Sequence, residues 1–219
     1  YVLAIEEISK IDASTSVAMS VNNSLVCWGL ENFGNQYQKQ KYLVPLAKGE
    51  KIGAFCLSEP EAGSDATSQK TTAIDKGDYY LLNGTKNWIT NGSTASTYLV
   101  IAQTDIEKGH RGINAFILEK GMEGFSASDI HGKLSLRCSI TSELSFENVC
   151  VPDSSRLPNV EGLKGPLSCL TQARFGISWG MVGAATDWYQ VALNYAKERK
   201  QFSKPIAAYQ LTQSKLANM

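Results

Sequence analysis

Two short segments in the middle of the chain combine small, polar and aromatic residues in patterns that could bind a ligand. The first is AFCLSEPEAGSD (54–65), a β-prone run that turns at Pro60 and Gly63 into small and polar residues. Such a turn leaves backbone N–H groups unpaired, and a concave nest of N–H groups can bond anionic or carbonyl oxygens. Ser58 and Ser64 add hydroxyls at the same place. By turn composition alone, the segment is more typical of an ordinary surface turn.

The second segment is YYLLNGTKNWIT (79–90), in which the Asn-Gly pair at 83–84 predicts a β-hairpin turn. Trp88, Ile89 and Thr90 would then finish the second strand of that hairpin, at the same rim of the sheet as the first segment. A lone tryptophan in a strand usually belongs to the core. An indole beside a hydroxyl, however, also suits a planar heteroaromatic cofactor, which needs a face to pack on and a partner for a ring nitrogen.

Charged side chains provide further candidates for chemistry. Glu59 and Glu61 flank Pro60 and are candidate general bases. Arg174 lies in an otherwise apolar helical stretch, and because a buried unpaired charge is costly, we expect it to have an anionic or strongly polar partner. Arg199, near the end of the same predicted helix, could instead belong to a solvated helix face.

Composition excludes several classes of function. Lys and Arg number 21, as do Asp and Glu, so no overall field would recruit nucleic acid or an anionic membrane. No apolar run approaches the roughly 18 residues needed to span a bilayer, and the first ten residues carry two glutamates where a signal peptide would be basic. The five cysteines are scattered and never spaced C-x-x-C, which indicates a reducing compartment and no metal site.

The elements that must position these residues follow an α–β–α order, which predicts an α+β fold. Residues 1–50 show helical periodicity, with Asp12 as a predicted N-cap and Gly34 as a predicted helix stop. Residues 51–155 form short β-rich runs typical of a barrel or sandwich. Helical periodicity returns in residues 156–219, with one long helix over about 166–200 and another opened by Pro205.

The order of elements excludes one class of fold, and the two ends of the chain give a separate prediction. Without strand–helix alternation and without a G-x-G-x-x-G or Walker A motif, the doubly wound nucleotide-binding folds are rejected. The chain starts without Met and stops inside a helical pattern, which predicts an internal fragment of a longer protein.

Five motifs stand in an order that resembles the acyl-CoA dehydrogenases, and the resemblance covers the whole chain. They are LSEPEAGSD, NGTKNWIT, ARFGISWG, ERKQFSKP and AAYQLTQ. The first half is similar to short-chain members, whereas GKLSLRCS and CLTQARFGISWG are more similar to glutaryl-CoA dehydrogenases. The resemblance implies part of an N-terminal helical domain (1–50), a central β-barrel domain (51–155) and part of a C-terminal helical bundle (156–219).

The resemblance also implies roles for individual residues. FAD would be the cofactor, and its binding residues in the barrel would be Phe55, Leu57, Ser58, Gly63, Ser64, Trp88, Ile89 and Thr90. Trp88 would pack against the isoalloxazine ring and Thr90 would bond its N5. Arg199, Phe202 and Gln210 would reach the FAD of a neighbouring subunit. Ser64, Thr171 and Arg174 would contact the acyl-CoA.

The implied reaction is α,β-dehydrogenation of a short-chain acyl-CoA, in which a carboxylate removes the α proton and flavin N5 accepts the β hydride. In this family the glutamate of the strand-end motif is not the base. Ala173 stands where some members carry a carboxylate, so no catalytic residue is expected in this chain, and the base is expected beyond Met219.

The resemblance further implies an electron-transfer flavoprotein as partner, a homotetramer built as a dimer of dimers, and a location in bacterial cytoplasm or the mitochondrial matrix. Neither nucleic acid nor a membrane is an expected partner. Three alternatives stay open: a decarboxylating glutaryl-CoA dehydrogenase, an acyl-CoA oxidase of the same fold, and a non-enzymatic β-sandwich interaction module.

Overall fold

The computed structural model describes all residues from Tyr1 to Met219. Its N-terminal part is helical and begins with α1 (Val2–Ile11) and α2 (Ala13–Ser20). Asp12 caps α2 as predicted, because its carboxylate accepts the N–H groups of Ser14 and Thr15 at 3.0 Å each. The chain continues through the π-helical segment η1 (Val21–Cys27) into α3 (Trp28–Phe33).

The predicted stop at Gly34 is confirmed, although Gly34 ends α3 in an extended conformation with φ −79° and ψ 151°, and no left-handed residue is needed. A second helical stretch follows immediately. It comprises α4 (Gln36–Gln38), the π-helical η2 (Lys39–Leu43) and α5 (Val44–Ala47).

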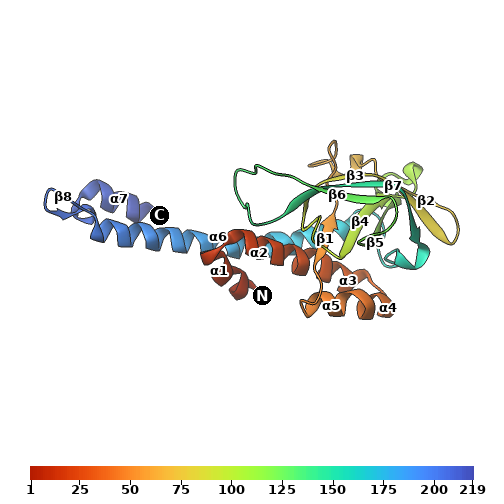
Figure 1. Cartoon of the computed structure of the whole chain (residues 1–219), viewed down its shortest axis with the longest axis horizontal. Helices are drawn as coiled ribbons and strands as arrows, with labels where there is room; N and C mark the ends of the chain where they lie inside the picture. Colours follow the sequence, from red (N-terminus) through yellow and green to blue (C-terminus); the bar gives the residue numbers. More distant parts are fainter.

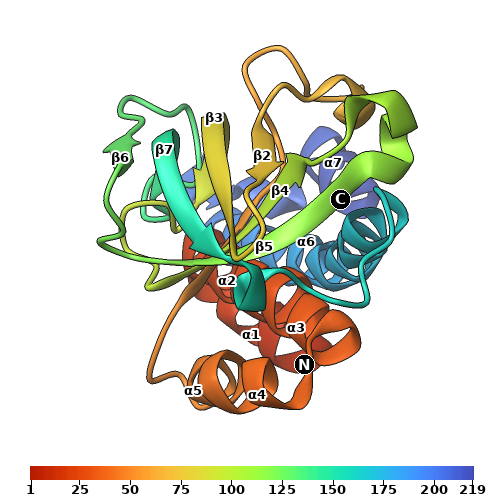
Figure 2. The same ribbon diagram turned by 90° about the vertical axis from the view of Figure 1, so that its right-hand side faces the viewer.

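A strongly curled sheet follows the helices (Figure 2). Its main strand order is β1-β4-β2-β3-β7-β6, and β5 pairs with β4 outside that path. The β1/β4 pair is parallel, while β2/β3, β3/β7, β6/β7 and β4/β5 are antiparallel. The predicted α+β class is confirmed. The strands are β1 (Gly53–Cys56), β2 (Thr72–Asp75), β3 (Tyr79–Thr90), β4 (Thr97–Gln103), β5 (Ile113–Glu119), β6 (Phe125–Asp129) and β7 (Thr141–Pro152).

The hairpin predicted at residues 83–84 is wrong. Strand β3 runs straight through this pair, and the actual turn lies around Gly77 between β2 and β3. Gly84 has φ +144° and lies at a shift in the β3/β7 register, so it forms part of a β-bulge in the strand. Close packing explains why the residue is glycine, because a β-carbon here would lie 2.5 Å from Oγ1 of Thr71.

Two apolar clusters cover the two faces of the sheet, and strand β4 contributes to both. Leu99 and Ile101 point into the cluster shared with the N-terminal helices and the start of α6, whereas Tyr98 and Val100 point into the cluster inside the curl. Side chains that alternate across a strand produce this division. Every residue of β4 is therefore buried.

One long helix, α6 (Lys164–Glu198), runs from the β-rich part along α1 and extends well beyond it (Figure 1). The chain then forms β8 (Lys200–Gln201), β9 (Lys204–Pro205), the 3₁₀ turn η6 (Ile206–Ala208) and α7 (Gln210–Asn218). Pro205 ends β9 and opens only the short 3₁₀ turn η6, whereas the last α-helix, α7, begins at Gln210. No helix has the length and apolar character to cross a membrane.

Candidate functional site

A cavity of about 310 Å³ lies between the ends of β1 and β3, the helical segment η1 and the start of α6. The structure brings nine of the predicted site residues to its wall: Phe55, Leu57, Ser58, Gly63, Ser64, Trp88, Ile89, Thr90 and Arg174. Sequence reasoning missed five further lining residues: Val21, Leu25, Ala66, Leu167 and Leu170. These five are apolar, and in the sequence they are indistinguishable from residues of the core.

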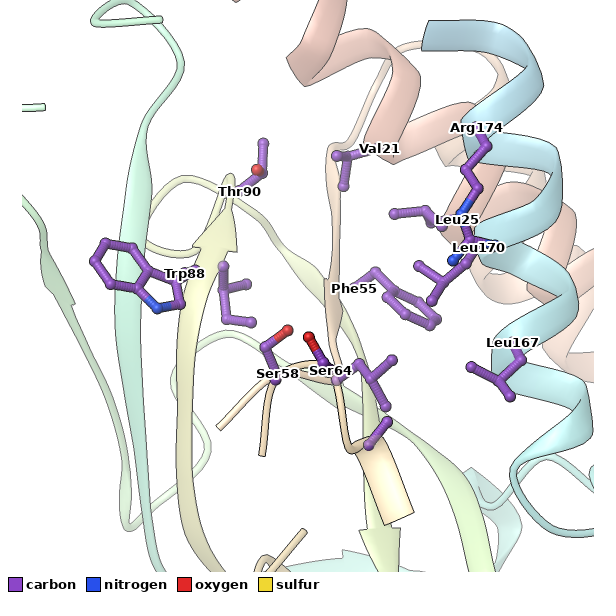
Figure 3. A pocket seen from close by; sticks show the side chains of 14 residues that line it. Val21, Leu25, Phe55, Ser58, Ser64, Trp88, Thr90, Leu167, Leu170 and Arg174 are labelled. Carbon is purple, nitrogen blue, oxygen red and sulfur yellow. The ribbon is translucent and has the colours of Figure 1, made fainter. Parts of the chain in front are cut away.

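The turn after β1 forms one wall of the cavity. Glu59 and Ala62 close it by exchanging two backbone hydrogen bonds of 3.1 and 3.2 Å. The N–H groups of Gly63 and Ser64 donate to no backbone acceptor, and the space around Gly63 is open. In Figure 3 the hydroxyls of Ser58 and Ser64 point toward the same space. The turn therefore presents N–H and hydroxyl donors together, which suits an anionic or carbonyl oxygen.

A buried ion pair lies directly behind this wall. Nζ of Lys86 is 2.7 Å from Oε1 of Glu59, and the two side chains are 0% and 4% exposed. Burial by itself would raise the pKa of Glu59, but the charge of Lys86 and hydrogen bonds from Lys86, Thr71 and Lys70 outweigh it and lower that pKa. Glu59 is therefore held as a carboxylate.

The two glutamates considered as bases do not face the cavity. Glu59 is buried and occupied by its hydrogen bonds, and the exposed Glu61 pairs with Lys70 at 3.2 Å on the surface. No carboxylate is among the side chains that line the cavity.

A bulge at the end of β3 determines the direction of Trp88. The register with β7 shifts between Lys86 and Ile89, and Trp88 has φ +61°, which is strained for a bulky side chain. Lys86 and Ile89 are both buried, so the bulge places Trp88 between them on the outer side, where it is 63% exposed. The N–H of Asn87 donates to the carbonyl of Ser58 at 2.8 Å, which ties the bulge to the turn.

Arg174 approaches the cavity from α6, across from Trp88 (Figure 3). The burial assumed for Arg174 is wrong, because the residue is exposed and forms no ion pair within the chain, whereas its expected anionic partner stays a prediction. The N-terminal helices cover only one side of this part of α6, and the nearby Phe175 is also 60% exposed. The guanidinium is therefore solvated and available to an anionic ligand.

The remaining predicted residues do not reach this cavity. Thr171 lies one turn before Arg174, but it is exposed and its hydroxyl donates to the carbonyl of Leu167 at 3.4 Å. The end of α6, β8 and α7 lie at the far end of the molecule from the sheet (Figure 1), and Arg199, Phe202 and Gln210, which belong to this segment, are exposed. Arg199 is roughly 37 Å further along α6 than Arg174, at about 1.5 Å per residue. Within one chain these three residues cannot touch the same ligand as Trp88.

Comparison with known proteins gives consistent matches along the chain. Three family models match in order: acyl-CoA dehydrogenase N-terminal domain over residues 1–50, middle domain over 54–149, and C-terminal domain over 161–219. The short-chain-specific acyl-CoA dehydrogenase of Clostridium acetobutylicum is 45% identical over 212 residues, which are 96% of this chain and 56% of that protein. The chain spans about half the length of the curated relatives it matches.

Two solved structures superpose closely. A glutaryl-CoA dehydrogenase from Mycobacterium smegmatis in complex with FADH2 has a TM-score of 0.95 at 45% identity, over 100% of this chain and 55% of that one. A structure described as the electron transferring flavoprotein of Acidaminococcus fermentans has a TM-score of 0.96 at 46% identity. The match covers 100% of this chain and 58% of that one. The fold expected from the sequence motifs is confirmed.

Proposed function

Because the chain belongs to the acyl-CoA dehydrogenase family, we propose that it serves in the FAD-dependent α,β-dehydrogenation of a short-chain acyl-CoA thioester. One observation supports this most directly. Trp88, the turn at Ser58–Ser64 and the unpaired Arg174 all line a single cavity.

The residues of the cavity fit a flavin. An exposed indole offers a flat apolar face, and the side chains of Phe55, Leu57 and Ile89 add apolar surface beside it. The free N–H groups of Gly63 and Ser64 suit oxygens of the cofactor, including those of its pyrophosphate. When bound, FAD would supply the oxidant, since it accepts the hydride that leaves the β carbon. Thr90 would donate or accept a hydrogen bond at the flavin ring.

Arg174 would bind the second ligand of the site, the acyl-CoA substrate. A solvated guanidinium at the mouth of the cavity attracts the phosphate-bearing acyl-CoA by charge. A smaller hollow of about 220 Å³ adjoins the cavity between α2 and α6, and it is lined by Val17, Ser20, Val21, Leu170, Ala173, Arg174 and Ile177. This largely apolar hollow suits a short acyl group, while Arg174 in its wall could also pair with a carboxylate, so a dicarboxylic substrate is tested beside a short-chain one below.

Proton abstraction needs a group that the cavity wall does not contain. Since no lining residue is a carboxylate, we propose that the base comes from outside these 219 residues. The positions of Arg199, Phe202 and Gln210, far from the cavity and exposed, support their proposed contact with the FAD of a neighbouring subunit, and hence a homo-oligomer such as a tetramer. An electron-transfer flavoprotein as electron acceptor and a bacterial or mitochondrial location remain predictions.

The test is anaerobic mixing of the purified full-length protein with acyl-CoA while the flavin absorbance is followed. We expect a yellow protein whose flavin bleaches with butyryl-CoA. The similarity to a glutaryl-CoA dehydrogenase makes glutaryl-CoA the necessary second substrate, and CO₂ release with it would assign the decarboxylating alternative. Rapid reoxidation of the bleached flavin in air would assign an oxidase. A colourless protein that takes up no flavin would contradict the proposed function.

A further inference from the structure

The two walls of the cavity that carry the indole and the donor turn are not neighbouring strands. Strand β1 pairs with β4, whereas β3 pairs with β2 and β7, so β1 and β3 are not paired directly and are connected in the sheet only through β4 and β2, which share a single pair of residues, Thr72 and Gln103. Yet the turn after β1 and the bulge at the end of β3 must keep a fixed spacing if they are to bind one ligand together. Direct contacts between the turn and the end of β3 would set that spacing more closely than this indirect connection.

Lys86 makes these contacts from the β3 side. Its ammonium group has three donors, and three acceptors surround it: the carbonyl of Leu57 at 3.0 Å, Oε1 of Glu59 at 2.7 Å and Oε1 of Gln69 at 3.2 Å. All three belong to the segment that leads into and out of the turn. The ammonium group is therefore fully satisfied although it is completely buried.

Glu59 makes the matching contacts from the turn. Besides Lys86, its carboxylate accepts the N–H of Lys70 at 2.6 Å and the N–H of Thr71 at 3.1 Å. One side chain thus closes the base of the loop formed by residues 59–71, and that loop contains the cavity residues Gly63 and Ser64. Asn87, next to Lys86, adds the backbone bond to Ser58 described above.

We propose that Lys86 and Glu59 are positioning residues, which hold the donor turn and the Trp88 bulge at the spacing that FAD binding requires. The proposal rests on the proposed function in its choice of FAD as the ligand. A buried pair is poor evidence for stability, because well-packed apolar residues often replace such pairs at little cost. The directional hydrogen bonds of this pair therefore point to a role in geometry, which apolar replacements would not fulfil.

The experiment compares three variants of the full-length protein. Glu59→Gln removes one charge, and Glu59→Leu combined with Lys86→Met removes the whole pair without leaving a buried charge. Glu61→Gln is the matched control, since Glu61 lies on the other side of Pro60 and its partner Lys70 is exposed. Two quantities are measured for each: the Kd for FAD added to the apoprotein, and hydrogen exchange of peptides covering residues 66–75 and 84–91.

We expect Glu59→Gln and the double variant to weaken FAD binding about tenfold, as loss of supporting contacts does at other sites. In the same variants the amides of Lys70 and Thr71 should exchange faster in the absence of FAD, while peptides from α6 are unchanged. Glu61→Gln should match the wild type in both measurements. Melting of the double variant close to the wild-type temperature would show that the loss concerns geometry and not folding.

Two results would overturn the proposal in different ways. Wild-type affinity for FAD in both Glu59→Gln and the folded double variant would reject the positioning role and leave the proposed function intact. A wild-type protein that binds no FAD would instead reject the proposed function, and with it the role of the pair in flavin binding. In that second case, faster amide hydrogen exchange at Lys70 and Thr71 in the variants would show that Glu59 and Lys86 only stabilise the loop and have no role in flavin binding.

Discussion

Gly84 and Thr71 are in such close contact that a β-carbon on Gly84 would lie 2.5 Å from Oγ1 and 2.7 Å from Cα of Thr71. The contact joins the bulge in β3 to the residue whose N–H bonds to Glu59. Gly84→Ala should therefore lower the free energy of unfolding by about 2–4 kcal/mol, through overpacking and an unfavourable positive φ. Urea unfolding followed by circular dichroism measures this change.

Gly77→Ala provides the comparison for that variant. Gly77 also has a positive φ, but no atom lies within 4 Å of the position of a β-carbon. Its substitution should cost only about 1 kcal/mol. If both variants lose the same unfolding free energy, the contact with Thr71 does not explain the glycine at position 84.

The paired substitution Trp88→Ala with Thr90→Val should weaken retention of FAD by about tenfold or more, because it removes both the flat face and the hydroxyl of the β3 wall. Flavin content after gel filtration and the flavin absorption spectrum are the measurements. Trp188→Ala is the control, since Trp188 is similarly exposed at 67% but lies on α6 and does not line the cavity. Unchanged flavin content and spectrum in the double variant would show that this rim does not hold the cofactor.

Arg174→Ala should raise the KM for acyl-CoA by about tenfold while FAD content stays unchanged, because the guanidinium is unpaired and faces the cavity mouth. Arg174→Lys keeps the charge and should recover part of the affinity at low ionic strength. Steady-state kinetics and flavin absorbance of the full-length protein distinguish the effects. A variant that loses flavin and keeps its KM would assign Arg174 to the cofactor or to the fold.

The Glu59–Lys86 pair should make stability depend on pH in acid. The pKa of Glu59 is lowered in the folded protein, so its contribution to stability is fully present above its ordinary value of about 4.5 and is lost as the pH falls through the lower folded value. Glu59→Gln should remove the part of the pH dependence that is due to Glu59. The unfolding free energy of this variant should therefore change less than that of the wild type as the pH falls below about 5. Urea unfolding at several pH values tests this, and Glu61→Gln should retain the wild-type profile.

The 219 residues expressed alone should not reduce FAD with butyryl-CoA or glutaryl-CoA. General-base catalysis contributes roughly 10²–10⁴-fold, and no carboxylate lines the cavity to provide it. Reconstitution with FAD, followed by anaerobic mixing with each substrate, checks this. Turnover at the rate of the full-length protein would place the base inside this chain, with the exposed Glu61 as the first residue to substitute.

Sequence by itself determined the α–β–α order of the three regions and identified nine of the residues that line the cavity. Ser58, Gly63 and Ser64 lie within one turn, and Trp88 and Thr90 lie at one strand end, so local chemistry was enough to identify them. The five motifs and their order were enough to indicate the family. Each motif is a short continuous stretch, so it can be recognised in the sequence without knowing the fold. Asp12 was identified as a cap for the same reason, because capping involves only neighbouring residues.

Tertiary structure alone decided which apolar residues face the cavity, in which direction Trp88 points, and why residue 84 is a glycine. Val21 and Leu170 have the same periodicity as core residues, and only the packing of η1 against α6 leaves them facing open space. The outward direction of Trp88 depends on a bulge defined by pairing with β7, and the role of Gly84 depends on contact with Thr71. The partnership of Glu59 with Lys86 likewise joins segments that no short-range pattern connects, because burial and hydrogen-bond geometry arise only when the chain has folded.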